Sequence, residues 1–189
     1  MKKVGADDLV PGVNMMDDQD TRILDVFRTH ASISYPWLDV GSGDSFNRQR
    51  LQERARKDGQ TIYVPDIDLD TDRYEFADGF FNMITSFELL EHLYNPLFHL
   101  MELRRILSPA GSLYLDTPND YSLIHKAEHV LSRKYRPHFH QFSERDMHDI
   151  LGRAGFEIVE LHKFHKSRGG TLARVSRNGL WVHAKKAPR

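Results

Sequence analysis

The sequence contains no cysteine, and this absence removes several kinds of chemistry at once. A chain without thiols has no disulfide framework, no thiolate metal site and no cysteine nucleophile. The lack of cysteine also fits a protein of a reducing compartment, so we expect a cytoplasmic location.

Long apolar runs are missing as well. The N-terminal twenty residues soon turn acidic and hold no stretch of signal-peptide length. Nothing in the chain approaches the roughly 18 apolar residues of a membrane span. The net charge of −1 argues against a protein held to nucleic acid mainly by its overall charge. We therefore expect no membrane span and no nucleic-acid partner.

What the chain does have is enough length, 189 residues, for one domain with a full core. We expect residues 1–189 to form a single domain. Within it, residues 1–34 form an N-terminal helical cap that includes an amphipathic helix from Met16 to His30, and residues 121–136 form a helical insert.

Short apolar runs alternate with helix-forming segments along this domain. The predicted strands are Trp37–Val40, Thr61–Val64, Phe80–Thr85, Ser112–Asp116, Phe156–Leu161 and Leu180–Lys185. The predicted helices are Arg48–Lys57, a helix from Asn95-Pro96 to about Leu107 and one that opens with a Ser143–Asp146 capping box. A turn is expected at Ser108–Gly111. This order predicts an α/β fold with a mostly parallel sheet covered on both faces and an antiparallel hairpin at the C-terminal end.

The first candidate binding segment follows the first predicted strand. It runs from Asp39 through Gly41, Ser42 and Gly43, and paired glycines after a strand let a ligand approach the backbone closely. A dinucleotide fingerprint requires a third glycine where Phe46 stands. This departure counts against a nicotinamide or flavin oxidoreductase.

Acidic and imidazole side chains follow the next two strands. Asp66 and Asp68 lie within reach of a strand end, where a carboxylate can bind ribose hydroxyls, although both also suit a solvated loop. If residues 88–92 are helical, Glu88, Glu91 and His92 share one face and can hold a metal or a general base. The alternative is that the two glutamates cap a helix while His92 bonds to a nearby loop.

Four segments in this order resemble class I S-adenosylmethionine-dependent methyltransferases, closest to the type 11 and type 23 group. They read WLDVGSGDS (37–45), GFFNMITSFELLEHLYNP (79–96), RRILSPAGSLYLDTPN (104–119) and HFHQFSERDMHDILGRAGFEIVEL (138–161). The resemblance implies a Rossmann-like three-layer sandwich and S-adenosylmethionine as cofactor. It assigns cofactor-binding roles to Asp39, Gly41, Ser42, Gly43, Asp66 or Asp68, Ser86 and Phe87.

The chain departs from that family pattern in two informative places. Asn82 stands where an aspartate is frequent. The segment between Gly43 and Phe80 is too short for the full family fold and lacks about one helix–strand unit, so that either the second or the third family strand remains.

The resemblance also suggests how the reaction proceeds. The expected acceptor is an oxygen or nitrogen of a small molecule or sugar-type compound, and insert 121–136 would cover it. Arg133, Lys134 and Arg136 could bind a phosphate on that acceptor. The candidate bases are His92, His138 and His140, because an unperturbed histidine titrates near working pH.

Two alternatives remain open. Glu88, Glu91, His92 and His138 or His140 resemble the metal ligands of small-RNA 3′-end and ubiquinone-pathway methyltransferases, which implies metal-assisted transfer to an RNA 3′ end or a catechol-like ring. Otherwise the chain is a catalytically inactive, cofactor-binding partner module.

Overall fold

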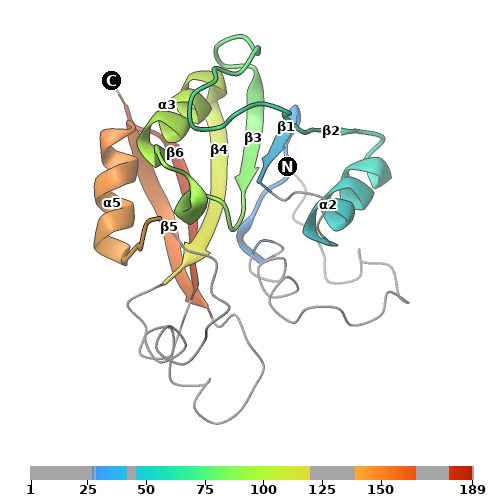
Figure 1. Ribbon diagram of the computed structural model, residues 1–189. Helices are drawn as coiled ribbons and strands as arrows, with labels where there is room; N and C mark the ends of the chain where they lie inside the picture. Colours follow the sequence, from blue (N-terminus) through green and yellow to red (C-terminus); the bar gives the residue numbers. More distant parts are fainter. Residues whose placement is uncertain (1–26, 28, 42–45, 120–138, 165–178, 189) are drawn as a thin grey trace, which may run out of the picture.

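The computed structural model describes residues 27, 29–41, 46–119, 139–164 and 179–188 (Figure 1). Its described strands form one sheet of six in the order β2-β1-β3-β4-β6-β5. The strands are β1 (Trp37–Val40), β2 (Ile62–Tyr63), β3 (Phe81–Ser86), β4 (Leu107–Pro118), β5 (Phe156–Phe164) and β6 (Gly179–Lys186). The helices are α2 (Phe46–Lys57), the 3-10 helix η2 (Leu90–His92), α3 (Pro96–Ile106) and α5 (Glu144–Arg153).

The strand directions confirm the predicted sheet. Strands β2, β1, β3 and β4 are mutually parallel, whereas β6 is antiparallel to both β4 and β5. The chain is thus a Rossmann-like α/β fold with an antiparallel C-terminal hairpin, as the sequence predicts.

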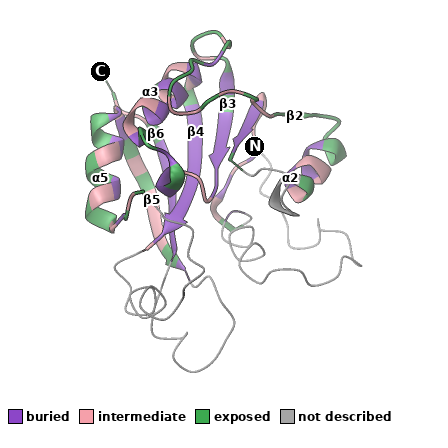
Figure 2. Cartoon of the chain, viewed as in Figure 1, coloured by how far each residue is buried: buried purple, intermediate pink, exposed green. Residues whose placement is uncertain are grey.

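Two buried clusters make the sheet the middle of three layers (Figure 2). On one face, leucines and isoleucines of α3 and α5, such as Leu103 and Leu151, pack against Leu38, Ile84 and Leu113. On the other face lies a largely aromatic cluster. In it, Phe27, which precedes β1, and Leu51 of α2 pack against residues of the strands. Its strand members are Trp37, Met83, Tyr114, Phe164 and Trp181. Both clusters exclude water from the sheet, which fits the near-continuous burial of β1 and β3.

The predicted shortening falls between β2 and β3. Residues 64–80, all of which are described, form neither a helix nor a strand. The remaining strand, β2, pairs directly with β1, the position of the second strand in a doubly wound sheet. Arg105 of α3 holds the connecting segment in place, donating hydrogen bonds to the carbonyl oxygens of Tyr74 and Phe76 and pairing with Asp78.

Local sequence signals set the helix starts. Asn95 accepts a hydrogen bond from the Phe98 amide, and Pro96 opens α3. Ser143 and Asp146 form the reciprocal capping box of α5, and these hydrogen bonds lower the pKa of the Asp146 carboxyl. Both predicted caps are confirmed.

The unusual Asn82 has a structural explanation. Its Nδ2 donates to the Tyr35 carbonyl oxygen at 2.5 Å, and its Oδ1 accepts from the Ser108 hydroxyl at 2.8 Å. An aspartate could accept the second hydrogen bond but could not donate the first. The amide therefore ties the start of β3 to the segments before β1 and within β4.

One predicted turn is wrong in detail, and two predicted helices are beyond the described residues. The expected turn at 108–111 is taken up into β4 as an irregularity, since Phe81 pairs with Leu107 but Met83 pairs with Ser112. The insert 121–136 and most of the helix expected from Met16 to His30 lie outside the described residues. In the described part of the chain, no helix is long and apolar enough to cross a membrane.

Candidate active site

The carboxyl ends of the parallel strands β1, β3 and β4 meet at one edge of the sheet (Figure 1). Loops leaving such an edge are the usual ligand site of an open α/β sheet. Gly41 follows β1, Glu88 follows β3 and Asn119 follows β4, so most of the predicted site residues gather here.

Gly41 is required by both conformation and space. Its φ of +88° lies in the left-handed region that side chains disfavour. A Cβ atom at this position would stand 2.7 Å from the Leu89 Cβ atom, so the loop after β1 packs closely against the loop after β3. Ser42 and Gly43, which continue the predicted binding loop, lie outside the described residues.

Asp39 is fully buried two residues before this glycine, near the end of β1. The Thr85 hydroxyl donates to its Oδ1 at 2.7 Å, and the Trp37 indole N–H donates to the same hydroxyl at 3.0 Å. This chain of hydrogen bonds fixes the Asp39 carboxylate between β1 and β3. The residue therefore shapes the end of β1 from inside the protein.

The two candidate ribose-binding carboxylates differ in their surroundings. Asp68 organises its own loop, because its Oδ1 accepts from the Asp70 amide at 2.9 Å. Asp66 is exposed and has no hydrogen-bond partner in the described part of the chain. Both carboxylates are exposed, and among the described residues Asp68 uses one of its oxygens within its own loop whereas Asp66 uses neither.

Ser86 ends β3 and Phe87 follows it, and both are almost completely buried. The Phe87 ring packs edge-on against Phe27, with ring centroids 5.7 Å apart, and so belongs to the aromatic core. The next residue, Glu88, has a φ of +50° and donates its backbone N–H to Asp116 Oδ1 at 3.0 Å. The loop after β3 is thus attached to the end of β4.

Glu91 lies in the interior with no exposed surface. The Thr117 hydroxyl donates to its Oε2 at 3.1 Å, and its backbone oxygen accepts from the amides of Phe139 and His140 at 2.9 and 3.3 Å. Because Glu91 is buried while His92 is exposed, and because Glu88 precedes η2, these three residues do not share one helix face. The conditional prediction of a common face is wrong, since the helix spans only residues 90–92.

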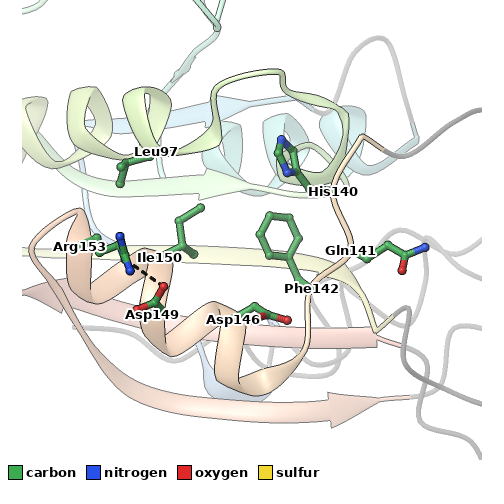
Figure 3. A pocket seen from close by; sticks show the side chains of 8 residues that line it. All are labelled: Leu97, His140, Gln141, Phe142, Asp146, Asp149, Ile150 and Arg153. Atoms are coloured by element: carbon green, nitrogen blue, oxygen red, sulfur yellow. Dashed lines mark hydrogen bonds and ion pairs between the residues drawn. The ribbon is translucent and has the colours of Figure 1, made fainter.

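The candidate bases lie in different surroundings. His92 is exposed at the end of η2, next to the strand edge. His140 is half-buried and lines a surface pocket of about 350 Å³ between α3 and α5, together with Leu97, Phe142 and Ile150 (Figure 3). The remaining lining residues of this pocket are Gln141, Asp146, Asp149 and Arg153. None of the predicted cofactor-binding residues lines it. His138 lies outside the described residues.

The alternative metal set is not brought together among the residues that can be placed. Within the described ranges, three side chains close enough to share one ion occur only at His30, Glu160 and His162. Glu88, Glu91 and His92 form no such group there, and His138 cannot be placed.

Asp116 and Thr117 were not predicted as site residues, yet both have no exposed surface at the carboxyl end of β4. Together with Asp39 and Glu91 they concentrate buried polar groups at this edge, a feature of functional sites. A sequence signal was present, because an Asp-Thr pair that ends an apolar strand is costly to bury without a function or a partner.

Comparison with known proteins identifies the family. The family model described as "Methyltransferase domain" (Methyltransf_23) matches residues 20–161, about three quarters of the chain. The chain belongs to this methyltransferase family. The resemblance drawn from the sequence is confirmed, and the chain is an S-adenosylmethionine-dependent methyltransferase.

Solved structures share the fold at low sequence identity. The Haloferax volcanii methyltransferase in complex with the Trm112 activator is 15% identical, with a TM-score of 0.66 over 91% of this chain and 90% of its own. A methyltransferase from Thermotoga maritima is 16% identical, with a TM-score of 0.63 over 88% and 89%. One from Archaeoglobus fulgidus is 15% identical, with a TM-score of 0.66 over 89% and 94%. No curated protein sequence matches the chain.

The cofactor of this methyltransferase is S-adenosylmethionine, and the geometry fits it. The left-handed backbone at Gly41 turns the loop after β1 at the strand edge, where Leu89 takes the space that a side chain would need. The exposed Asp66 carboxylate lies three residues beyond β2 and can accept hydrogen bonds from ribose hydroxyls.

Proposed function

We propose that this methyltransferase modifies an oxygen or nitrogen of a small, ring-containing acceptor such as a sugar or a sugar phosphate. The observation that carries the proposal is a pair of exposed, stacked aromatic rings beside the strand edge. Tyr94 and Phe139 are 71% and 46% exposed, and their ring centroids lie 4.2 Å apart.

The position of this aromatic pair supports an acceptor-binding role. Tyr94 is two residues from His92, and the Phe139 amide donates to the backbone oxygen of Glu91. Large exposed rings at the edge of a ligand site offer a flat apolar surface, on which sugar rings and planar molecules pack. The pair would hold such an acceptor next to the exposed imidazole.

For the cofactor, we assign the methionine part to the loop of Gly41, Ser42 and Gly43 and the ribose to Asp66. Asp39, Ser86 and Phe87 are buried, and in this proposal they position the loops after β1 and β3. S-adenosylmethionine supplies an electrophilic methyl group. The protein contributes alignment of the acceptor with that methyl group.

His92 is the proposed general base, with His138 and His140 as the other candidates. It would take the proton from the acceptor oxygen or nitrogen as the acceptor is methylated. Glu91 supports this role by position, because it anchors η2 to β4 on one side and to residues 139–140 on the other. The base is thereby held on a short, well-fixed element.

The test is binding followed by an acceptor screen. Calorimetry of the purified full chain with S-adenosylmethionine and with its demethylated product is expected to show one site per chain. Mass spectrometry of sugars, sugar phosphates and aromatic amines after incubation is expected to show a gain of one methyl group. Cofactor binding without turnover on any acceptor would favour the inactive partner module instead.

The cytoplasmic location also remains a prediction. Fractionation of cells that produce the full-length protein is expected to recover it with the cytoplasmic fraction, and recovery with membranes would contradict the expectation.

A further inference from the structure

A second cluster of chemically active side chains lies at β5 and β6, the two strands at one end of the sheet order. It consists of His30, which precedes β1, and of Glu160 and His162 of β5. The potential ligand atoms of these three residues all lie within 4.8 Å of one another. Nothing in the proposed transfer reaction uses them.

The fold brings the three residues onto one face. Glu160 and His162 are two residues apart on β5, so their side chains point to the same side of the sheet. Trp181 of β6 lies directly opposite His162 and belongs to the aromatic cluster. The two side chains therefore point to the face of the sheet that carries this cluster. The His30 and His162 rings both lie near the Trp181 ring, at centroid distances of 5.5 and 5.6 Å.

The distances are those of a metal-ligand set. His30 Nδ1 and His162 Nε2 each lie 3.2 Å from the same carboxylate oxygen, Glu160 Oε2. Zinc bonds of about 2.0–2.1 Å to nitrogen and oxygen place neighbouring ligand atoms of a tetrahedral site about 3.3 Å apart. Two of the three separations therefore match ligands of one ion, and the ligand atoms of the two imidazoles lie within 4.8 Å of each other.

Charge and access also favour a cation. A glutamate side chain between two imidazoles offers one anionic oxygen ligand and two nitrogen ligands, a donor set that suits a divalent transition metal. The side chains of His30, Glu160 and His162 are 31%, 41% and 38% exposed, which leaves an open path for an ion from solvent.

We propose that His30, Glu160 and His162 bind one divalent transition-metal ion, for which Zn²⁺ is the best match. Two imidazoles and one carboxylate are a common three-ligand zinc set, with water in the fourth position. The ion would join the segment before β1 to β5, two parts of the chain 130 residues apart. None of its three residues is among those proposed to bind the acceptor or the cofactor.

The test uses the purified full chain after chelator treatment and dialysis. Calorimetric titration with ZnCl₂ is expected to show one strong site, and Zn²⁺ is expected to raise the melting temperature. His162→Ala and Glu160→Gln are expected to weaken this binding at least tenfold and to abolish the rise in melting temperature. The matched control is His148→Ala, an exposed histidine on α5, which is expected to bind Zn²⁺ like the parent.

The outcomes separate this site from the other histidines of the chain. Binding that is lost in His92→Ala but kept in His162→Ala would overturn the proposal, as would a parent protein that binds no Zn²⁺. If His162→Ala fails to fold, Glu160→Gln decides alone, because it keeps the size of the side chain and removes its charge. Zinc binding that Glu160→Gln leaves unchanged would also overturn the proposal.

Discussion

The hydroxyl of Thr117 donates a 3.1 Å hydrogen bond to the carboxylate of Glu91, and neither side chain has any exposed surface. This contact joins the end of β4 to η2. Since the backbone oxygen of Glu91 also accepts from Phe139 and His140, one buried glutamate fixes three segments around the proposed base.

Removal of the Thr117 hydroxyl tests this arrangement. Thr117→Val keeps the shape of the side chain but removes a hydrogen bond to a buried carboxylate, and is expected to cost about 1–3 kcal/mol in the free energy of unfolding. Thr117→Ser, the control, keeps the donor and should lose less. Urea denaturation of the parent and both variants measures the free energies of unfolding. If Thr117→Val were as stable as the parent, the hydrogen bond would contribute nothing to stability.

The glycine after β1 provides a second prediction. Gly41→Ala places a Cβ atom 2.7 Å from Leu89 at a φ of +88°, so we expect the loop to shift and S-adenosylmethionine to bind at least tenfold more weakly. The control is Gly152→Ala in α5, where no atom lies within 4 Å of the added Cβ. That change should leave cofactor binding intact and increase helix stability by about 0.5–1 kcal/mol. Calorimetry with the cofactor distinguishes the two variants.

Asp66 and Asp68 are separated by a pair of matched substitutions. If Asp66 binds the ribose, Asp66→Ala removes hydrogen bonds to a charged group, worth about 1.5–3 kcal/mol, and raises the dissociation constant of S-adenosylmethionine roughly ten- to a hundredfold. Asp68→Ala releases only the Asp70 amide and should change the constant much less. The opposite ranking would move the ribose to Asp68.

The candidate base is tested by the pH profile of methyl transfer. His92→Ala is expected to lower kcat by about 10²–10⁴-fold and to remove the acidic limb of the profile, because a protonated imidazole cannot act as a base. The KM of the cofactor should stay close to that of the parent. His140→Ala is the matched comparison, and a larger loss of kcat in that variant would identify His140 as the base.

The fold was predictable where a local signal and the hydrophobic pattern agreed. The caps at Asn95 and Ser143 and the strand at Trp37–Val40 appear where the sequence places them, because each depends on neighbouring residues. The expected shortening before Phe80 is equally visible, since residues 64–80 are too few for another helix and strand.

The site was harder to predict because its contacts join residues distant in sequence. Glu91 and His92 are adjacent, yet Glu91 is buried, where its carboxylate accepts from Thr117, and His92 is exposed. His30 and Glu160 are also in contact although they lie 130 residues apart in the sequence, and only the folded chain brings them together. Nothing within a few residues of either one indicates the other.

Buried His99 in α3 leads to a prediction about stability and pH. Burial lowers its pKa from 6.5 to about 4, an effect that nearby Asp70 opposes only in part, so the ring is neutral in the folded protein. Its two ring nitrogens have no hydrogen-bond partner in the described part of the chain. The His99 ring binds a proton more tightly in the unfolded chain than in the folded protein. The contribution of the neutral ring to the free energy of unfolding is therefore fully present above pH 6.5 and is lost as the pH falls toward 4.

The expected loss from His99 is about 2 kcal/mol at pH 5 relative to pH 7.5, from the linkage between pKa and unfolding. His99→Leu removes the titrating group, so its free energy of unfolding should fall less over the same interval. His183, whose pKa is lowered mainly by burial, remains in both proteins and contributes equally. Urea denaturation of parent and variant at the two pH values measures the difference. Parallel losses in the two proteins would mean that His99 is not buried in its neutral form.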